Sequence, residues 1–194
     1  MRSGIENDRI YEDAYFDSCF CENTVISDTQ FYRCTFDKNS FQYVELKNCS
    51  FEDCFFKNCN CSLMKINNVR FTGTHFSGCK LLAVNWSSAS KIFTAKFIHS
   101  NLNNAVFDNM NLDKFIFDEC SLEDAAFSNV SLSEACFKDC CLKKCTFSNT
   151  DLSHADFSTA YDYFISSETN KLHKTVFSLP EAMSLLKNFD IILQ

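Results

Sequence analysis

The sequence predicts a repeat protein, and three observations support this prediction. Large apolar residues recur every five positions along most of the 194-residue chain. Smaller residues, often Cys or Ala, stand two positions before them. The chain also has only 3 Gly and 1 Pro. Conventional all-β folds need both residues for their turns, so this chain either has another kind of fold or makes its turns by another device.

The five-residue period falls into two runs. We call the large apolar residue of each five-residue unit its centre. The first run has 16 centres, from Tyr11 to Trp86, and the second has 13, from Phe97 to Phe157. A period of five matches neither the α-helix nor the β-strand. The two runs are out of register by one residue, and with Ile92 as the intervening centre we predict a bulge or small loop at residues 87–93.

These units resemble the pentapeptide-repeat family, whose pattern is small–(Asp/Asn)–(Leu/Phe)–polar–any. The stretches "SNLNN" (100–104), "TDLSH" (150–154) and "ADFST" (155–159) are close to that pattern. The resemblance implies an all-β solenoid, a right-handed quadrilateral β-helix with four units in each coil. Its coils would stack at about 4.8 Å, the usual spacing of strands. The repeat itself would then make the turns, which explains the scarcity of Gly and Pro.

The chain divides into three predicted parts: a lead-in at residues 1–10, the β-helix at 11–160, and a C-terminal segment at 161–194. In the last part, "SLPEAMSLLKNF" (178–189) has the composition of a helix. Ser178 is a candidate N-cap, Pro180 suits the first turn, and Glu181 completes a capping box. One interpretation of this helix is an apolar lid on the open end of the solenoid.

The same segment, read as "VFSLPEAMSLLKNFDIIL", resembles the tail of the gyrase-protecting branch of the family, the Qnr-type quinolone-resistance and albicidin-resistance proteins. A second stretch, "KLLAVNWSSA" (80–89), resembles a segment of the albicidin-resistance member. The resemblance implies a homodimer built by the C-terminal helix and strand. The expected interface residues are Phe177, Leu179, Met183, Leu185, Leu186, Phe189, Ile191 and Leu193.

The 13 cysteines do not predict a metal site or a disulfide framework. They contain no C-x-x-C pair or zinc-like spacing, and "MRSGIENDRIYEDAYF" lacks the apolar core of a signal peptide. We expect a cytoplasmic protein with reduced thiols, no membrane span and no cofactor. Most of the cysteines occupy the small position two before a centre and should be buried: Cys19, Cys34, Cys49, Cys54, Cys59, Cys79, Cys120, Cys140 and Cys145.

Catalytic motifs are absent from the sequence. It has no Ser/His/Asp arrangement, no Gly-rich phosphate loop and no HExxH motif, and its four histidines are scattered. We therefore expect neither an enzyme nor a small-molecule substrate.

The charge pattern points to a protein partner. The chain has a net charge of −7, and residues 108–162 hold 11 acidic residues against four lysines. Such a surface disfavours direct nucleic-acid binding. It either keeps the protein soluble or imitates DNA, which is how the resembled branch engages its target. The candidate partner-binding residues are Asp113, Asp118, Asp124, Glu134, Asp139, Asp151 and Asp156.

The resemblance implies that the partner is DNA gyrase, through its A subunit, or topoisomerase IV, and that binding protects the enzyme from a quinolone or a peptide-like toxin. The predicted bulge supplies further candidate contacts: Ser87, Ser88, Ser90 and Lys91. The alternative is a structural or adaptor solenoid that binds another protein. Oligomeric state separates the two, since a monomer favours the adaptor.

Overall fold

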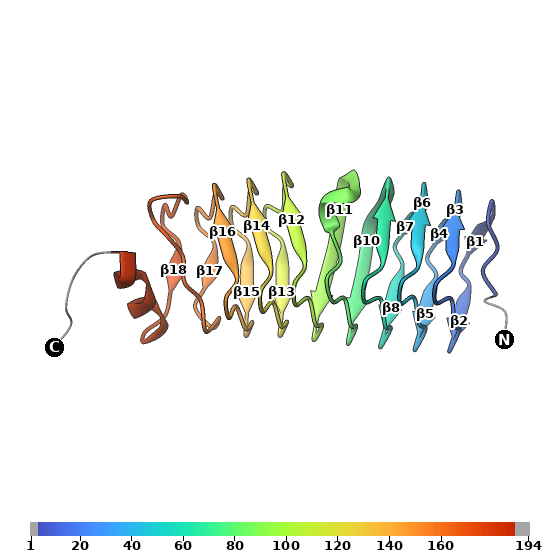
Figure 1. The fold of residues 1–194 in the computed structure, drawn as a ribbon, viewed down its shortest axis with the longest axis horizontal. Coiled ribbons are helices and arrows are strands. Elements are labelled where there is room, and N and C mark those ends of the chain that lie inside the picture. Colours follow the sequence, from blue (N-terminus) through green and yellow to red (C-terminus); the bar gives the residue numbers. More distant parts are fainter. Residues whose placement is uncertain (1–3, 189–194) are drawn as a thin grey trace.

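The chain forms a right-handed quadrilateral β-helix of about eight coils with almost no helix (Figure 1), as the sequence predicts. The computed structural model describes residues 4–188, without the side chains of Ile92, Lys187 and Asn188. Short strands of successive coils pair in parallel. The strands are β1 (Ile10–Glu12), β2 (Tyr15–Asp17), β3 (Val25–Ser27), β4 (Gln30–Tyr32), β5 (Thr35–Asp37), β6 (Glu45–Lys47), β7 (Ser50–Glu52), β8 (Phe55–Lys57), β9 (Lys65–Asn67), β10 (Val69–Ser77), β11 (Ala89–Ile98), β12 (Val106–Asp108), β13 (Ile116–Asp118), β14 (Ala126–Ser128), β15 (Cys136–Lys138), β16 (Thr146–Ser148), β17 (Asp156–Phe157) and β18 (Val176–Phe177).

The stacking register follows from the repeat. Away from the bulge, each residue pairs with the residue 20 positions further on, as Phe31 does with Phe51 and Phe117 with Phe137. Identical side chains therefore stack, and one phenylalanine column runs through the core. Its successive ring centroids lie 4.6–5.8 Å apart. The column consists of Phe16, Phe36, Phe56, Phe76, Phe97, Phe117, Phe137, Phe157 and Phe177.

A second aromatic column changes sides at the bulge. In the N-terminal half it runs from Tyr11 to Phe71, on the face next to the first column. In the C-terminal half it consists of Phe107, Phe127 and Phe147, whose rings meet the first column edge to face across the core, 6.0 Å away for Phe127 and Phe117. The fully buried Trp86 joins the two halves, because its ring contacts Phe71, Phe76, Phe97 and Phe107.

The turns use left-handed backbone at residues other than glycine. The residue two after most centres has a positive φ, for example Asp13 (51°), Asn48 (51°) and Lys114 (60°). Asn and Asp adopt this conformation more easily than most residues, and they are common at this position. Glycine is needed where space is short: a Cβ on Gly73 (φ 61°) would lie 2.3 Å from Oδ1 of Asp53. The repeat thus makes its turns with few glycines.

The predicted bulge is present, but its inward residue differs from the prediction. A short 3₁₀ turn, η1 (Trp86–Ser88), precedes β11. Val69 of β10 pairs with Ala89, Phe71 with Phe93, and Thr74 with Ala95. Two residues are therefore inserted before Phe93 and one is removed after it. Phe93 is buried and faces Phe71 and Trp86, so the choice of Ile92 as the centre was wrong.

The solenoid continues to residue 177. Lys171 forms a bridge with Asp151, and Phe157 pairs with Phe177, which keeps the spacing of 20. Asp162 and Ser167 stand where centres would fall, and the buried Tyr163 and Ile165 fill the interior instead. The final coil could have been found in the sequence, because "KLHKTVF" (171–177) repeats the pattern of "DLSHADF" (151–157).

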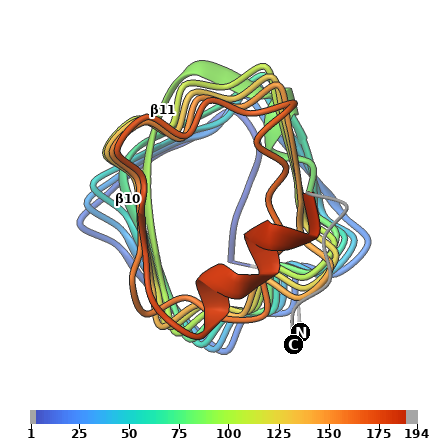
Figure 2. The same ribbon diagram turned by 90° about the vertical axis from the view of Figure 1, so that its left-hand side faces the viewer.

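A C-terminal helix lies across the end of the last coil (Figure 2). It is the 3₁₀ helix η2 (Glu181–Asn188), and Leu185 packs against the core. The carboxylate of Glu181 accepts a hydrogen bond from the backbone N–H of Asp162 (3.1 Å) and not the predicted one from Ser178. The segment therefore covers the open end. Between residues 4 and 188, the fold contains no helix with the length and apolar character required to cross a bilayer.

Candidate interaction surfaces

The β-helix distributes the predicted acidic residues over different faces. We name two faces of the C-terminal half by a central residue. The Phe137 face, with centres from Phe97 to Phe177, carries Asp118, Asp139 and Asp156. The Leu132 face, with centres Leu112, Leu132, Leu152 and Leu172, carries Asp113, Glu134 and Asp151. Asp124 lies beside Leu122 on a third face.

Several of these carboxylates pair with a lysine of the adjacent coil, 20 residues away. The N···O distances are 2.9 Å for Asp118–Lys138, 3.7 Å for Glu134–Lys114 and 2.8 Å for Asp151–Lys171. Partial burial raises the pKa of Asp151, but hydrogen bonds from Lys171 and Ser153 outweigh it and lower the pKa to about 2. The coil stacking thus turns a spacing of 20 in the sequence into contact between opposite charges.

The Phe137 face keeps an excess of negative charge. From the unit centred on Phe97 onward it carries four carboxylates, those of Asp118, Glu119, Asp139 and Asp156, against the ammonium groups of Lys96 and Lys138. Glu119 was missed by the sequence reasoning, although it lies 20 residues before Asp139; its carboxylate contacts Nδ1 of His99 at 3.1 Å. Within residues 4–188, Asp139 forms no ion pair. The Leu132 face, by contrast, balances its three carboxylates with Lys114, Lys171 and Lys174.

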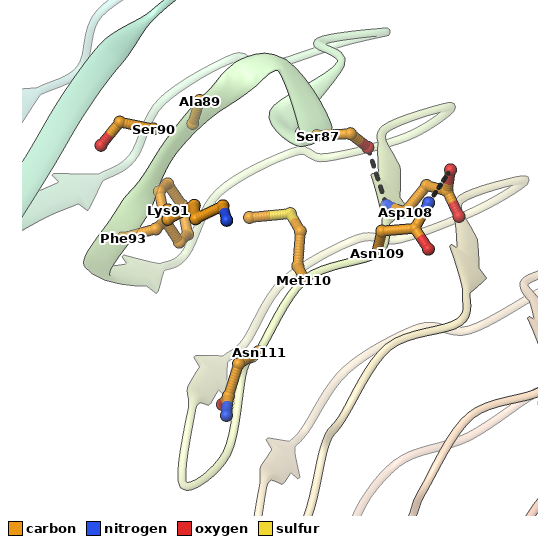
Figure 3. Close-up of a pocket in the computed structure, with 9 residues that line it drawn as sticks. All are labelled: Ser87, Ala89, Ser90, Lys91, Phe93, Asp108, Asn109, Met110 and Asn111. Carbon is orange, nitrogen blue, oxygen red and sulfur yellow. Dashed lines mark hydrogen bonds between the residues drawn. The ribbon is translucent and has the colours of Figure 1, made fainter.

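The bulge creates a groove between β11 and the following coil (Figure 3). Its cavity has a volume of about 630 Å³ and contains three of the predicted contact residues, Ser87, Ser90 and Lys91. Ser88 does not line it. Phe93 and Met110 supply apolar surface, and the Lys91 side chain extends toward Met110 (Figure 3). A contiguous cavity of about 270 Å³ shares Phe93 and Asn111 and extends to Ile116.

Ser87 fixes one wall of this groove. Its Oγ accepts a hydrogen bond from the backbone N–H of Asp108 (2.7 Å), which ties η1 to β12 (Figure 3). Its own N–H donates to Oδ1 of Asn85 (3.1 Å), the N-cap of η1. The bulge is therefore hydrogen-bonded to the coil that follows it.

The predicted dimer residues occupy different environments. Phe177 and Leu185 pack against the core of their own chain, and Leu186 is half-buried. Leu179 and Met183 are exposed, with 79% and 47% of their surface accessible. Phe189, Ile191 and Leu193 lie outside the described residues. Leu179 and Met183 are thus apolar side chains at the end of the solenoid that do not pack against the core of their own chain.

All 13 cysteines are free thiols. Of the nine predicted to be buried, eight are buried and Cys19 is half-buried. Across the part of the chain that the structure describes, no three His, Cys, Asp or Glu side chains come together as a metal site would require.

The coiled architecture and its five-residue unit define a class of protein. The family description "Pentapeptide repeats" matches this chain with eight copies, at residues 45–81, 111–143 and 140–161. The chain therefore belongs to the pentapeptide-repeat family. No curated protein matches it significantly.

Solved structures are similar to this chain at low identity. Trypsin-treated QnrB1, a plasmid-mediated fluoroquinolone resistance protein, is 19% identical with a TM-score of 0.46, covering 98% of this chain and 100% of its own. HetL, a pentapeptide repeat protein involved in heterocyst differentiation regulation in the cyanobacterium Nostoc, is 12% identical with a TM-score of 0.46, covering 87% of this chain and 88% of its own.

Proposed function

We propose that this protein is a non-enzymatic, cytoplasmic homodimer that binds a type II DNA topoisomerase, either the A subunit of DNA gyrase or topoisomerase IV. Binding protects the enzyme from a quinolone or a peptide-like toxin. The observation that carries the proposal is the acidic Phe137 face, which combines unbalanced carboxylates with a rigid support.

The geometry of this face suits a surface that normally binds DNA. Asp118, Asp139 and Asp156 lie on three successive coils, which are spaced about 4.8 Å apart, and they stand one after, two after and one before the stacked phenylalanine of their coil. Carboxylates held in this way compete for the Lys and Arg side chains that bind phosphates. B-DNA carries a charge about every 1.7 Å, so the protein imitates only part of a duplex.

A supercoiling assay tests the proposal. Purified gyrase and a quinolone are titrated with the parent protein or with the variant Asp139→Asn/Asp156→Asn. We expect the parent to restore supercoiling and the variant to need a concentration about five-fold higher or more, because two charges of the contact surface are lost. The matched control is Asp17→Asn/Glu52→Gln, which removes two exposed carboxylates from the N-terminal half.

Two results would reject the proposal. One is the absence of both rescue and binding at micromolar protein for gyrase and for topoisomerase IV. The other is an equal loss in the control variant, which would mean that only the total charge of the protein matters.

Dimerisation has its own test. The sequence resemblance of the tail and the exposure of Leu179 and Met183 support an interface at the C-terminal end. We expect the parent protein to sediment as a dimer and Leu179→Asp/Met183→Asp to sediment as a monomer. Leu63→Asp, at an exposed site far from this end, should remain dimeric. A monomeric parent protein would contradict the dimer.

The adaptor function is the second candidate, and the groove beside the bulge favours it. An apolar depression lined by polar groups is typical of surfaces that bind another protein, and it needs no topoisomerase. Failure of the supercoiling assay together with a monomeric protein would favour this function.

A further inference from the structure

We propose that the groove at the register break binds an acidic peptide segment that carries an apolar side chain. The groove consists of the two contiguous cavities lined by residues 87, 89–91, 93–96 and 108–116. This proposal does not depend on the topoisomerase function. It rests on the apolar floor of the groove and on the charges around it.

The floor exists because the bulge displaces Phe93. Its ring stacks on Phe115 of the next coil, with centroids 5.9 Å apart, although Phe115 occupies a position where other units carry a small residue. Met110, another large side chain at such a position, is only half-buried. Met110 is therefore the side chain of this apolar lining that reaches solvent most, while Phe93 and Phe115 keep only 8% and 7% of their surface accessible.

Two of the three lysines that line the groove lack an acidic partner within the described residues, whereas Lys114 pairs with Glu134. Among the residues that the structure describes, neither Lys91 nor Lys96 forms an ion pair, unlike four of the other lysines in the C-terminal half. Lys96 lies beside His75 across the β10–β11 pairing. Burial, and then the charge of Lys96, lowers the pKa of His75. Two ammonium groups thus remain without a neutralising partner at the groove.

The carboxylates near the groove are turned toward their own chain. Asp108 accepts hydrogen bonds from Nδ2 of Asn109 (2.8 Å) and of Asn129 (3.2 Å). Asp113 accepts from Oγ of Ser131 (2.5 Å) and from the backbone N–H of Ser133 (3.0 Å). The lining of the groove thus combines apolar surface with Lys91 and Lys96, whose ammonium groups form no ion pair within the described residues, beside two carboxylates whose oxygens already accept hydrogen bonds from the chain. An acidic segment with an apolar side chain complements the two lysines and the apolar surface.

Fluorescence polarisation with labelled model peptides tests this assignment. The probe is a fluorescein-labelled twelve-residue peptide of alternating acidic residues and leucines; its counterpart carries lysines in place of the acidic residues. We expect the full-length protein to bind the acidic peptide and not the basic one. Lys91→Glu/Lys96→Glu should weaken binding at least about ten-fold, because it reverses both charges.

The matched control is Lys65→Glu/Lys80→Glu, which makes the same charge change at exposed lysines outside the groove. It should bind the acidic peptide about as well as the parent. A further variant, Met110→Glu, places a charge on the floor and should also weaken binding, and it keeps the test decisive if the double variant does not fold. Thermal unfolding of each variant verifies the fold.

Three outcomes would overturn the proposal: no binding of the acidic peptide, equal binding of the basic peptide, or an equal loss in the Lys65/Lys80 control. If sedimentation instead shows that Lys91→Glu/Lys96→Glu dissociates an oligomer of the parent protein, the occupant is a second copy of this chain and the proposal is wrong. None of these results depends on gyrase, so this proposal and the topoisomerase function can fail separately.

Discussion

At the scale of single residues, the small position two before each centre has a second role besides packing. The Sγ of Cys54 lies 3.4 Å from the carbonyl oxygens of Phe31 and Glu52. In the next coil, Oγ1 of Thr74 donates to the carbonyl of Phe51 at 3.0 Å. Burial raises the pKa of Cys54 to about 12, so its thiol keeps its proton at neutral pH. Cys, Thr and Ser are thus exchangeable donors to backbone carbonyls here.

Substitutions of Cys54 should reveal this role. We expect Cys54→Ala to lower the free energy of unfolding by about 1–2 kcal/mol, because it removes a donor and leaves a small cavity. Cys54→Ser should cost less, because its hydroxyl can donate to the same carbonyls. Urea unfolding at pH 7 gives both values. A serine variant less stable than the alanine variant would show that packing alone decides this position.

At the scale of elements, the regular stacking of coils is interrupted at the bulge, where the hydrogen-bonded 3₁₀ turn η1 takes its place. Trp86 fills the core where the second aromatic column changes sides, while Ser87 holds the outer wall against β12. Ser88, its neighbour, has a backbone carbonyl that accepts from Asn68 (3.3 Å). The side chain of Ser87 is therefore the part of the turn that accepts a hydrogen bond from the next coil.

Ser87→Ala should loosen this connection. The backbone N–H of Asp108 would lose its acceptor, and we expect the free energy of unfolding to fall by about 1 kcal/mol. Faster amide hydrogen exchange at residues 108–110 should accompany this loss. Ser88→Ala is the matched control and should change neither quantity. Equal exchange rates in the two variants would mean that the Ser87 hydroxyl does not hold the groove wall.

At the scale of the whole molecule, electrostatics follows the spacing of 20. The pairs Asp13–Arg33, Asp118–Lys138, Glu123–Lys143 and Asp151–Lys171 all join adjacent coils. Exposed pairs of this kind contribute little individually. At these positions the spacing places opposite charges above one another, whereas elsewhere it stacks like charges, as for Asp17 and Asp37.

Acid should weaken one of these links in a defined pH range. The pKa of Asp151 is about 2 in the folded protein and roughly 3.9 in an unfolded chain. Because the folded value is the lower one, the stabilisation is present above about pH 4 and is lost as the pH falls toward 2. In Lys171→Ala, the pKa of Asp151 should rise toward its usual value, and stability should depend less on pH in this range.

A carboxyl-detected NMR titration of Asp151, with urea unfolding at pH 6 and pH 3, measures both effects. Lys174→Ala changes a neighbouring lysine and should leave the titration of Asp151 as in the parent. An unchanged pKa in Lys171→Ala would show that the lysine is not the partner that stabilises the carboxylate.

The sequence predicts the regular part of this molecule well, because one five-residue rule determines burial, register and turn position together. The sequence-based prediction fails where two departures from the five-residue period compensate each other in length. At the bulge, two residues inserted before Phe93 and one removed after it have the same total as a single insertion at Ile92. After Phe157, two units lack a centre although the coil keeps its length. To assign each carboxylate to a face, the spacing of 20 must also be used. A count of charges over residues 108–162 does not use it.

The spacing of 20 has a consequence for length. Every coil adds about 4.8 Å along the axis and returns each face to the same side. Removing 20 residues in register, such as 116–135, would bring Phe97 into stacking contact with Phe137 and leave every face in its place. The distance from the groove to the C-terminal end would shorten by one coil. Away from the bulge, the distance between two surfaces of this protein can therefore change only in steps of one coil.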